Sequence, residues 1–225
     1  MKRMKIDLSS ALKELESKDM EWEKTTREGL DVDYAQLLPR NIACELMTQL
    51  ETNIEYYSGD LTKVKVFGKW HQIPRQQVAY GDEGLKYHFS GVTLPAKPWI
   101  NPLISIRELI SKVTGHNYNF VLINRYRNGS DHIGKHRDDE SELDSTAPIA
   151  SLSLGQHRDF ILTHGNRQKK EYENKDLTTV KIMLQHGSLL LMNPPTNKYW
   201  YHSLPPRKSA PGVRINLTFR KINIK

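Results

Sequence analysis

The sequence of 225 residues has little cysteine and no long apolar run. Cys44 is the only cysteine, which excludes a disulfide within the chain and a zinc cluster built on several cysteines. No apolar stretch approaches the roughly 20 residues that a membrane helix needs. Lys2, Arg3 and Lys5 have no apolar stretch behind them, so we expect no secretory signal and place the chain in the reducing interior of a cell.

The sequence carries an excess of positive charge, and that excess lies in its later part. The formal net charge is +7. Residues 1–50 hold 8 basic and 10 acidic side chains, whereas residues 51–225 hold 25 and 16. A basic folded body is typical of proteins that bind a polyanion such as nucleic acid. Charge alone is equally compatible with a soluble basic protein.

Residues 1–30 form a charged segment that is poor in glycine, proline and aromatic residues. Residues 9–24 are compatible with a short exposed helix and equally with disorder, because they show no wide apolar stripe. We therefore expect a charged N-terminal extension over residues 1–30 and one compact domain over residues 31–225.

Two helices and a series of short strands are predicted within this domain. Apolar residues recur every four positions after Pro39, and a second apolar stripe runs from Leu103 to Val113 and ends before Gly115. Short β-rich runs follow at 119–127, 148–155, 158–164, 179–184, 188–192 and 213–222. Short strands without helices between them favour a sandwich, barrel or jelly roll, with the two helices covering a sheet.

The segment His136-Arg137-Asp138 is the first candidate for chemistry. Residues i and i+2 of an extended chain point to the same side, so His136 and Asp138 can reach one metal ion. A third ligand has to come from the other histidines, and His202, just before the last strand, is the best placed. Two histidines and one carboxylate form the facial triad of non-haem Fe(II) oxygenases. Alone, this H-x-D pattern is far more often an ordinary surface sequence.

The last predicted strand separates apolar from polar residues. Ile215, Leu217 and Phe219 share one face, and the other face carries Arg214, Asn216, Thr218 and Arg220. Such a strand either lies at the surface or lines a cavity with its polar face. In a cavity, the two arginines would bind the two ends of a dicarboxylate, because guanidinium groups bind carboxylates bidentately.

Together these patterns resemble the AlkB-type Fe(II)/2-oxoglutarate-dependent dioxygenases. The H-x-D pattern, the later histidine and R-x-N-x-T-x-R occur in the order typical of that family. The resemblance covers about residues 60–222 and is closest to the members that repair double-stranded DNA. It rests on segments 66–71, 84–91, 120–126, 131–140, 148–151, 186–190, 200–205 and 216–222.

The resemblance implies an α+β fold with a mainly β core, a double-stranded β-helix (jelly roll) with flanking helices. It implies Fe(II) held by His136, Asp138 and His202, with 2-oxoglutarate and O2 as co-substrates. Arg220 would pair with the distal carboxylate of 2-oxoglutarate, and Arg214 with the end near the iron. Further hydrogen bonds to the co-substrate would come from Asn124, Tyr126 and Thr218.

The activity implied by the resemblance is the oxidative demethylation of alkylated bases in duplex DNA by direct reversal. This reaction releases succinate, CO2 and formaldehyde. The substrates that it implies are 1-methyladenine and 3-methylcytosine, with etheno adducts as a further candidate class.

An enzyme that acts on a base inside duplex DNA has to flip the nucleotide out of the stack. Phe67, followed by Gly68 and Lys69, matches the apolar finger that fills the resulting gap in this family. The alternative is that Phe67 is a core residue of a hairpin. A nucleotide-recognition lid is expected over about residues 60–95. The residues that match the family's base pocket are Tyr87, His88, Phe89, Ser90, Asp139 and Glu140, for which strand packing and an acidic loop are the alternatives.

Basic side chains are candidates for contacts to the DNA backbone, which position a duplex without reading its sequence. These candidates are Lys69, Arg158, Arg167, Lys169, Lys170, Arg207 and Lys208. The family's basic run after the distal histidine is shorter here, because Ser209 follows Lys208. Residues 1–7 lack the aromatic residue of the clamp-binding motif of vertebrate relatives, so recruitment to a replication clamp is not supported. We expect a monomer, and the resemblance implies a nuclear location.

Two alternative functions stay open from the sequence. The same chemistry could act on single-stranded DNA or RNA, or the chain could be a non-catalytic DNA-binding module that keeps the fold. The intact H-x-D…H set and both arginines argue against the second alternative. A finger at Phe67 would favour duplex DNA over single strands.

Overall fold

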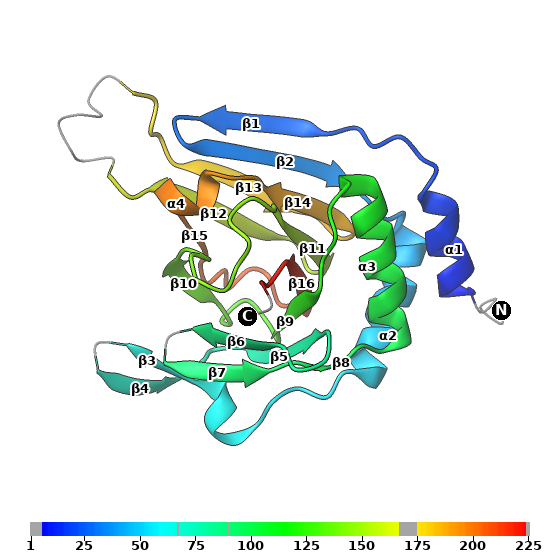
Figure 1. The fold of residues 1–225 in the computed structure, drawn as a ribbon, viewed down its shortest axis with the longest axis horizontal. Coiled ribbons are helices and arrows are strands. Elements are labelled where there is room, and N and C mark those ends of the chain that lie inside the picture. The colour runs from blue at the N-terminus through cyan, green and yellow to red at the C-terminus, as the bar shows by residue number, and fades with distance from the viewer. Residues whose placement is uncertain (1–5, 67, 90, 167–174, 224–225) are drawn as a thin grey trace.

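Two β-sheets and two hairpins form the body of the computed structural model, which describes residues 6–66, 68–89, 91–166 and 175–223 (Figure 1). The larger sheet has eight strands in the order β1 (Glu23–Arg27), β2 (Leu30–Gln36), β14 (Ser188–Met192), β11 (Ile149–Gly155), β16 (Arg214–Arg220), β9 (Phe120–Tyr126), β5 (Gln76–Gly81) and β8 (Lys97–Pro98). The smaller sheet has the order β10 (Ile133–His136), β15 (Trp200–Leu204), β12 (Arg158–His164) and β13 (Val180–Leu184). The hairpins are β3 (Lys63–Val66) with β4 (Lys69–Gln72) and β6 (Lys86–Phe89) with β7 (Val92–Pro95). This arrangement confirms the mainly β core with flanking helices.

The two predicted helices are confirmed as α2 (Arg40–Asn53) and α3 (Asn101–Thr114). Gly115 ends α3 with a φ of +72°, a left-handed conformation that glycine adopts without a steric penalty. The buried leucines and isoleucines of both helices join one core cluster with residues of the larger sheet. Shorter helical elements are α4 (Thr196–Tyr199) and the 3-10 helix η1 (Gly59–Thr62). No helix of the described residues is long and apolar enough to cross a membrane.

The N-terminal segment differs from the expected free extension. Residues 8–15 form α1 (Leu8–Leu15), and its buried side chains Leu8, Leu12 and Leu15 join the same core cluster as the buried residues of α2 and α3. Strand β1 then pairs with β2 along its whole length. The expectation of an exposed or disordered segment is wrong for these residues, because one narrow leucine stripe at helical spacing is enough to attach the helix. Residues 1–5 lie outside the described residues, and with them most of the segment that we compared with a clamp-binding motif.

Strand β16 lies at the centre of the larger sheet, between β11 and β9. All seven of its residues are buried, which excludes the surface-strand alternative. Ile215, Leu217 and Phe219 pack into the apolar cluster under the helices. The opposite face carries the polar residues Arg214, Asn216, Thr218 and Arg220, which line a cavity. The period-2 pattern of the sequence thus corresponds to two buried faces of different chemistry.

Candidate active site

The three predicted metal ligands meet between β10 and β15. His136 is paired with His202 across these two antiparallel strands, and Asp138 follows two residues after His136. One ligand atom from each of the three side chains lies within 4.8 Å of the other two. Asp138 and His202 are buried, and His136 is partly exposed. This set of two imidazoles and one carboxylate fits Fe(II).

Both histidines can donate a nitrogen lone pair to a metal ion. The Nδ1 atom of His136 lies 2.9 Å from the carbonyl oxygen of Gly134, so Nδ1 donates a proton to it and Nε2 remains as the ligand atom. Burial lowers the pKa of His202 to about 3. Burial also lowers the pKa of His136, against the opposing effect of Asp138. The two side chains are therefore neutral at neutral pH, the form that binds a metal.

Asp138 is held by a buried ion pair. The Nη2 atom of Arg220 donates to the Oδ2 atom of Asp138 at 2.7 Å, and both side chains are 4% exposed. Burial alone would raise the pKa of Asp138, but the positive charge of Arg220 and the neighbouring His202 outweigh burial and lower the pKa below its ordinary value. The other oxygen, Oδ1, lies 3.7 Å from the Nε2 atom of His136 and faces the metal position. Asp138 is thus a fixed anionic ligand.

This ion pair favours a different order of the two arginines from the one expected from the sequence. We expected Arg220 at the distal carboxylate of 2-oxoglutarate and Arg214 near the iron. The contact with Asp138 places Arg220 at the metal end of the cavity. Arg214 lies six residues earlier on the same strand face, away from Asp138, and this geometry favours Arg214 for the distal carboxylate. The sequence did not distinguish the two arginines, because β16 carries one at each end of the same polar face.

Arg214 has the environment of a carboxylate receptor. Its side chain is 2% exposed, and its Nη2 atom donates to the hydroxyl of Ser153 at 2.9 Å. Its Nε atom is buried and has no hydrogen-bond partner among the described residues. The guanidinium carbon lies 5.2 Å from the ring centre of Tyr126. Burial lowers the pKa of Arg214 to about 10. A buried cation without an anionic partner is costly, and a bound carboxylate would remove that cost.

A cavity of about 70 Å³ brings these groups together. Its walls contain the three metal ligands and all five predicted co-substrate residues, Asn124, Tyr126, Arg214, Thr218 and Arg220. The sequence reasoning missed other wall residues, among them Arg75, Ser151, Phe160 and Met192. These residues come from different strands and a loop, and only the pairing of the strands brings them to the cavity.

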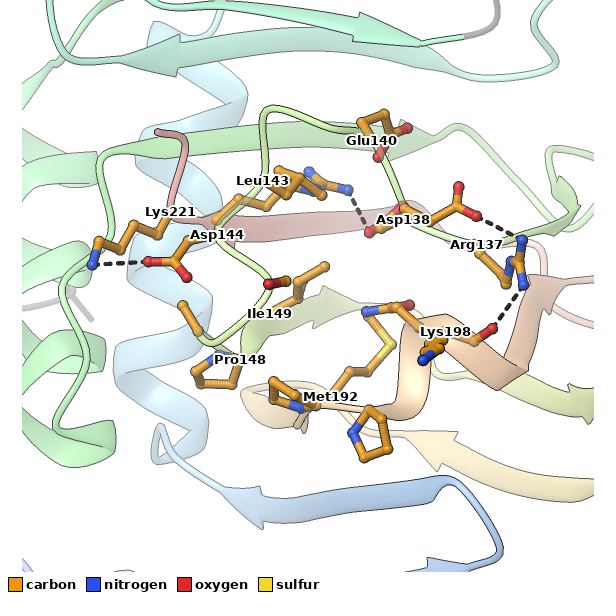
Figure 2. A pocket seen from close by; sticks show the side chains of 17 residues that line it. Arg137, Asp138, Glu140, Leu143, Asp144, Pro148, Ile149, Met192, Lys198 and Lys221 are labelled. Atoms are coloured by element: carbon orange, nitrogen blue, oxygen red, sulfur yellow. Dashed lines mark hydrogen bonds and ion pairs between the residues drawn. The ribbon is translucent and has the colours of Figure 1, made fainter. Parts of the chain in front are cut away.

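A second, larger cavity of about 420 Å³ adjoins the first and shares Asp138 and Arg220 with it (Figure 2). Pro148, Ile149 and Met192 form its apolar part, as Figure 2 shows. Ion pairs mark its two ends, Asp144 with Lys221 at 3.0 Å and Arg137 with Asp139 at 2.7 Å. The metal end of the first cavity therefore adjoins the larger cavity, whereas Arg214 lines only the smaller one.

The predicted base-pocket residues divide between the cavities and the surface. Tyr87 and Glu140 line the metal cavity, and Asp139 and Glu140 line the larger one. Burial, together with the charge of Asp138, raises the pKa of Glu140. His88 points elsewhere: its side chain is exposed and its ring bonds to the hydroxyl of Thr93. The side chain of Phe89 and all of Ser90 lie outside the described residues.

The structure describes only some of the residues that we predicted as the finger and as contacts to the DNA backbone. Phe67, Arg167, Lys169 and Lys170 lie outside the described residues. Gly68 has a φ of +79°, which supports the expected tight turn of the β3–β4 hairpin, and Lys69 and Lys208 are exposed. Arg207 is half-buried and lies 3.7 Å from Asp159.

The structure contradicts the expected contact of Arg158 with the DNA backbone. Its side chain is 1% exposed, and its Nη2 atom donates to the carbonyl oxygens of Asp131 and Pro205. It therefore ties two loops together inside the protein and is not available to a phosphate group.

Comparisons with known proteins agree with this site. The sequence matches the 2OG-Fe(II) oxygenase superfamily over residues 32–220. It is 53% identical over 201 residues to the DNA oxidative demethylase ALKBH2 of Homo sapiens, covering 89% of this chain and 77% of that protein. It is 51% identical over 205 residues to the mouse (Mus musculus) protein of the same name, covering 91% of this chain and 85% of that protein. The human alpha-ketoglutarate-dependent dioxygenase alkB homolog 3 is 37% identical over 156 residues, which cover 68% of this chain and 53% of that protein.

The fold also has a relative among solved structures. The structure of OsALKBH1 superposes with a TM-score of 0.58 and 18% identity, covering 89% of this chain and 100% of that one. This likeness confirms the fold. The cofactors of the superfamily, Fe(II), 2-oxoglutarate and O2, fit the His-Asp-His set and the arginine-lined cavity described above. On the match over residues 32–220, the chain belongs to the 2OG-Fe(II) oxygenase superfamily.

Proposed function

We propose that this chain demethylates alkylated bases in DNA by oxidation, using Fe(II), 2-oxoglutarate and O2. The observation that carries the proposal is the 53% identity, over most of both chains, to a protein named DNA oxidative demethylase. The geometry supports it, since the ligand set and the cavity are complete within this chain. The proposed substrates are 1-methyladenine and 3-methylcytosine in duplex DNA, and the same pocket would admit etheno adducts.

The chain's own residues have separate tasks in this reaction. His136, Asp138 and His202 would hold the iron, which with 2-oxoglutarate supplies the oxidation of the N-methyl group, and formaldehyde then leaves the base. Arg214 would bind the distal carboxylate of 2-oxoglutarate. Arg220 keeps Asp138 charged and fixed. Burial of these groups excludes water, which strengthens every electrostatic contact inside the cavity.

The damaged base would enter on the side of Tyr87 and Glu140. Both side chains line the metal cavity. The raised pKa of Glu140 means that this carboxyl group more readily carries a proton and can then donate a hydrogen bond. Phe67 would fill the gap that the flipped base leaves, and Lys69, Arg207 and Lys208 would contact phosphates. A monomer that acts on nuclear DNA completes the proposal.

Replacing Phe67 with alanine tests whether the substrate is duplex or single-stranded DNA. We expect the variant to lose at least about tenfold in rate on a 1-methyladenine duplex, because the unstacking that the finger offsets costs a few kcal/mol. The rate on the same lesion in a single strand should change less than about twofold. The measurement is lesion loss by mass spectrometry, with Trp70→Ala, a substitution of an exposed aromatic residue on β4, as the matched control. Equal losses on the two substrates would contradict a finger role and favour exposed single strands or RNA.

A further inference from the structure

Arg75 is a buried arginine that the site described so far does not use. It directly precedes β5, its side chain is 8% exposed, and it lines the metal cavity. Its position in the sequence, after Ile73 and Pro74, belongs to none of the motifs that pointed to the site. Burying a guanidinium is costly, so its hydrogen bonds indicate what it contributes.

The strongest bond of Arg75 goes to a predicted co-substrate residue. The Nε atom of Arg75 donates to the Oδ1 atom of Asn124 at 2.7 Å, and both side chains are buried. The Nη1 atom of Arg75 lies 3.5 Å from the carbonyl oxygen of His132. Because an arginine only donates hydrogen bonds, the atom that it contacts on Asn124 has to be the amide oxygen. The NH2 group is then the part of this amide that remains to bind a ligand in the cavity.

The charged side chains that line the cavity also indicate an anionic ligand. Three buried arginines line it, Arg75, Arg214 and Arg220. Of these three arginines, only Arg220 forms an ion pair with a carboxylate of the described residues. Burial lowers the pKa of Arg75, yet an arginine keeps its charge in a protein. The three arginines outnumber the two carboxylates of the cavity, Asp138 and Glu140, and a bound dicarboxylate would offset this excess of positive charge.

We propose that Arg75 is a positioning residue for 2-oxoglutarate: it fixes the amide of Asn124 so that its NH2 group, and not its oxygen, faces the bound co-substrate. The opposite amide orientation would place two oxygen atoms against each other and weaken binding. The inference rests on the proposed role of Asn124 in binding the co-substrate. It assigns Arg75 an effect on the affinity for 2-oxoglutarate and none on the chemical step.

The test compares Arg75→Met, which removes the donors at similar length, with Arg75→Lys, which keeps the charge and one donor. Affinity is measured directly by calorimetry of 2-oxoglutarate binding to the Mn(II)-loaded full chain, which requires neither DNA nor turnover. We expect Arg75→Met to weaken binding about tenfold or more and Arg75→Lys to recover part of that loss, since hydrogen bonds of charged groups carry effects of this size. In turnover, the KM for 2-oxoglutarate should rise while kcat at saturation changes less than about twofold.

A double-mutant cycle separates positioning from a general loss of structure. Asn124→Ala should weaken binding to a similar degree, and adding Arg75→Met to it should cost little more, because the bond is already absent. Arg125→Met is the matched control, since Arg125 is the next residue of β9 and pairs with Glu51. Unchanged affinity in Arg75→Met, or fully additive losses in the cycle, would overturn the proposal. A failure of DNA demethylation with these binding results intact would instead contradict the proposed function alone.

Discussion

Replacing Asp138 with alanine is expected to abolish turnover and to destabilise the fold. The carboxylate is one of the three atoms that define the metal position. Replacing a residue that only hydrogen-bonds to a metal ligand lowers the metal affinity about 10–100-fold. Loss of the ligand itself should therefore lower the iron affinity more than about 100-fold. The variant also leaves Arg220 buried without its ion-pair partner. Removing one partner of a buried pair costs roughly 3–5 kcal/mol, and we expect a loss of this size in the free energy of unfolding.

Iron binding and urea unfolding measure the two effects separately. Asp139→Ala is the matched control, because this neighbouring carboxylate pairs with Arg137 at the surface and is no metal ligand. It should retain the iron affinity and the stability of the unmodified protein. The double variant Asp138→Ala, Arg220→Met should recover part of the lost stability, since no buried charge then stays unpaired. Iron affinity and turnover unchanged in Asp138→Ala would refute the metal assignment.

The second large effect separates the two arginines of β16. Arg214→Met should raise the KM for 2-oxoglutarate by about 10–100-fold, because a buried charge-assisted contact to the distal carboxylate is lost. High concentrations of 2-oxoglutarate should restore most of kcat. Arg220→Met removes the partner of Asp138, so its main effect should be a fall in kcat that added 2-oxoglutarate does not restore. Initial rates over a wide range of 2-oxoglutarate concentrations measure both parameters.

The opposite pattern would reinstate the order of the two arginines that we first expected from the sequence. In that case Arg220→Met would be rescued by 2-oxoglutarate and Arg214→Met would not. Arg158→Met serves as a comparison for the general effect of losing a buried arginine. Its guanidinium binds loop carbonyls outside the cavity, so it should change stability more than the KM for 2-oxoglutarate.

The fold was predictable where periodic patterns are long. The apolar spacing after Pro39 and the stripe that ends at Gly115 predicted α2 and α3, and the alternation in β16 predicted its two faces. Helix α1 and strand β10 were not predictable in this way. Helix α1 has only three buried leucines over eight residues, and β10 has only four residues. Their structure depends on contacts with distant segments, which no local pattern contains.

The candidate site shows the same division. His136, Asp138 and His202 followed from spacing and order, and the structure brings them together. The roles of Arg214 and Arg220 did not follow, because their strand carries an arginine at each end and only the contact with Asp138 distinguishes them. No sequence pattern pointed to Arg75, since its role depends on a hydrogen bond to Asn124, 49 residues later in the chain.

The most direct test of the account is formaldehyde release from a duplex that contains one 1-methyladenine. The protein is supplied with Fe(II), 2-oxoglutarate and O2, and Asp138→Ala is the control. We predict one formaldehyde and one succinate for each methyl group removed, with unmodified adenine as the DNA product, and none of these from the control. If the lesion stays in both duplex and single strand while 2-oxoglutarate is still consumed, the chain is an oxygenase with another substrate, and the proposed DNA demethylation is wrong.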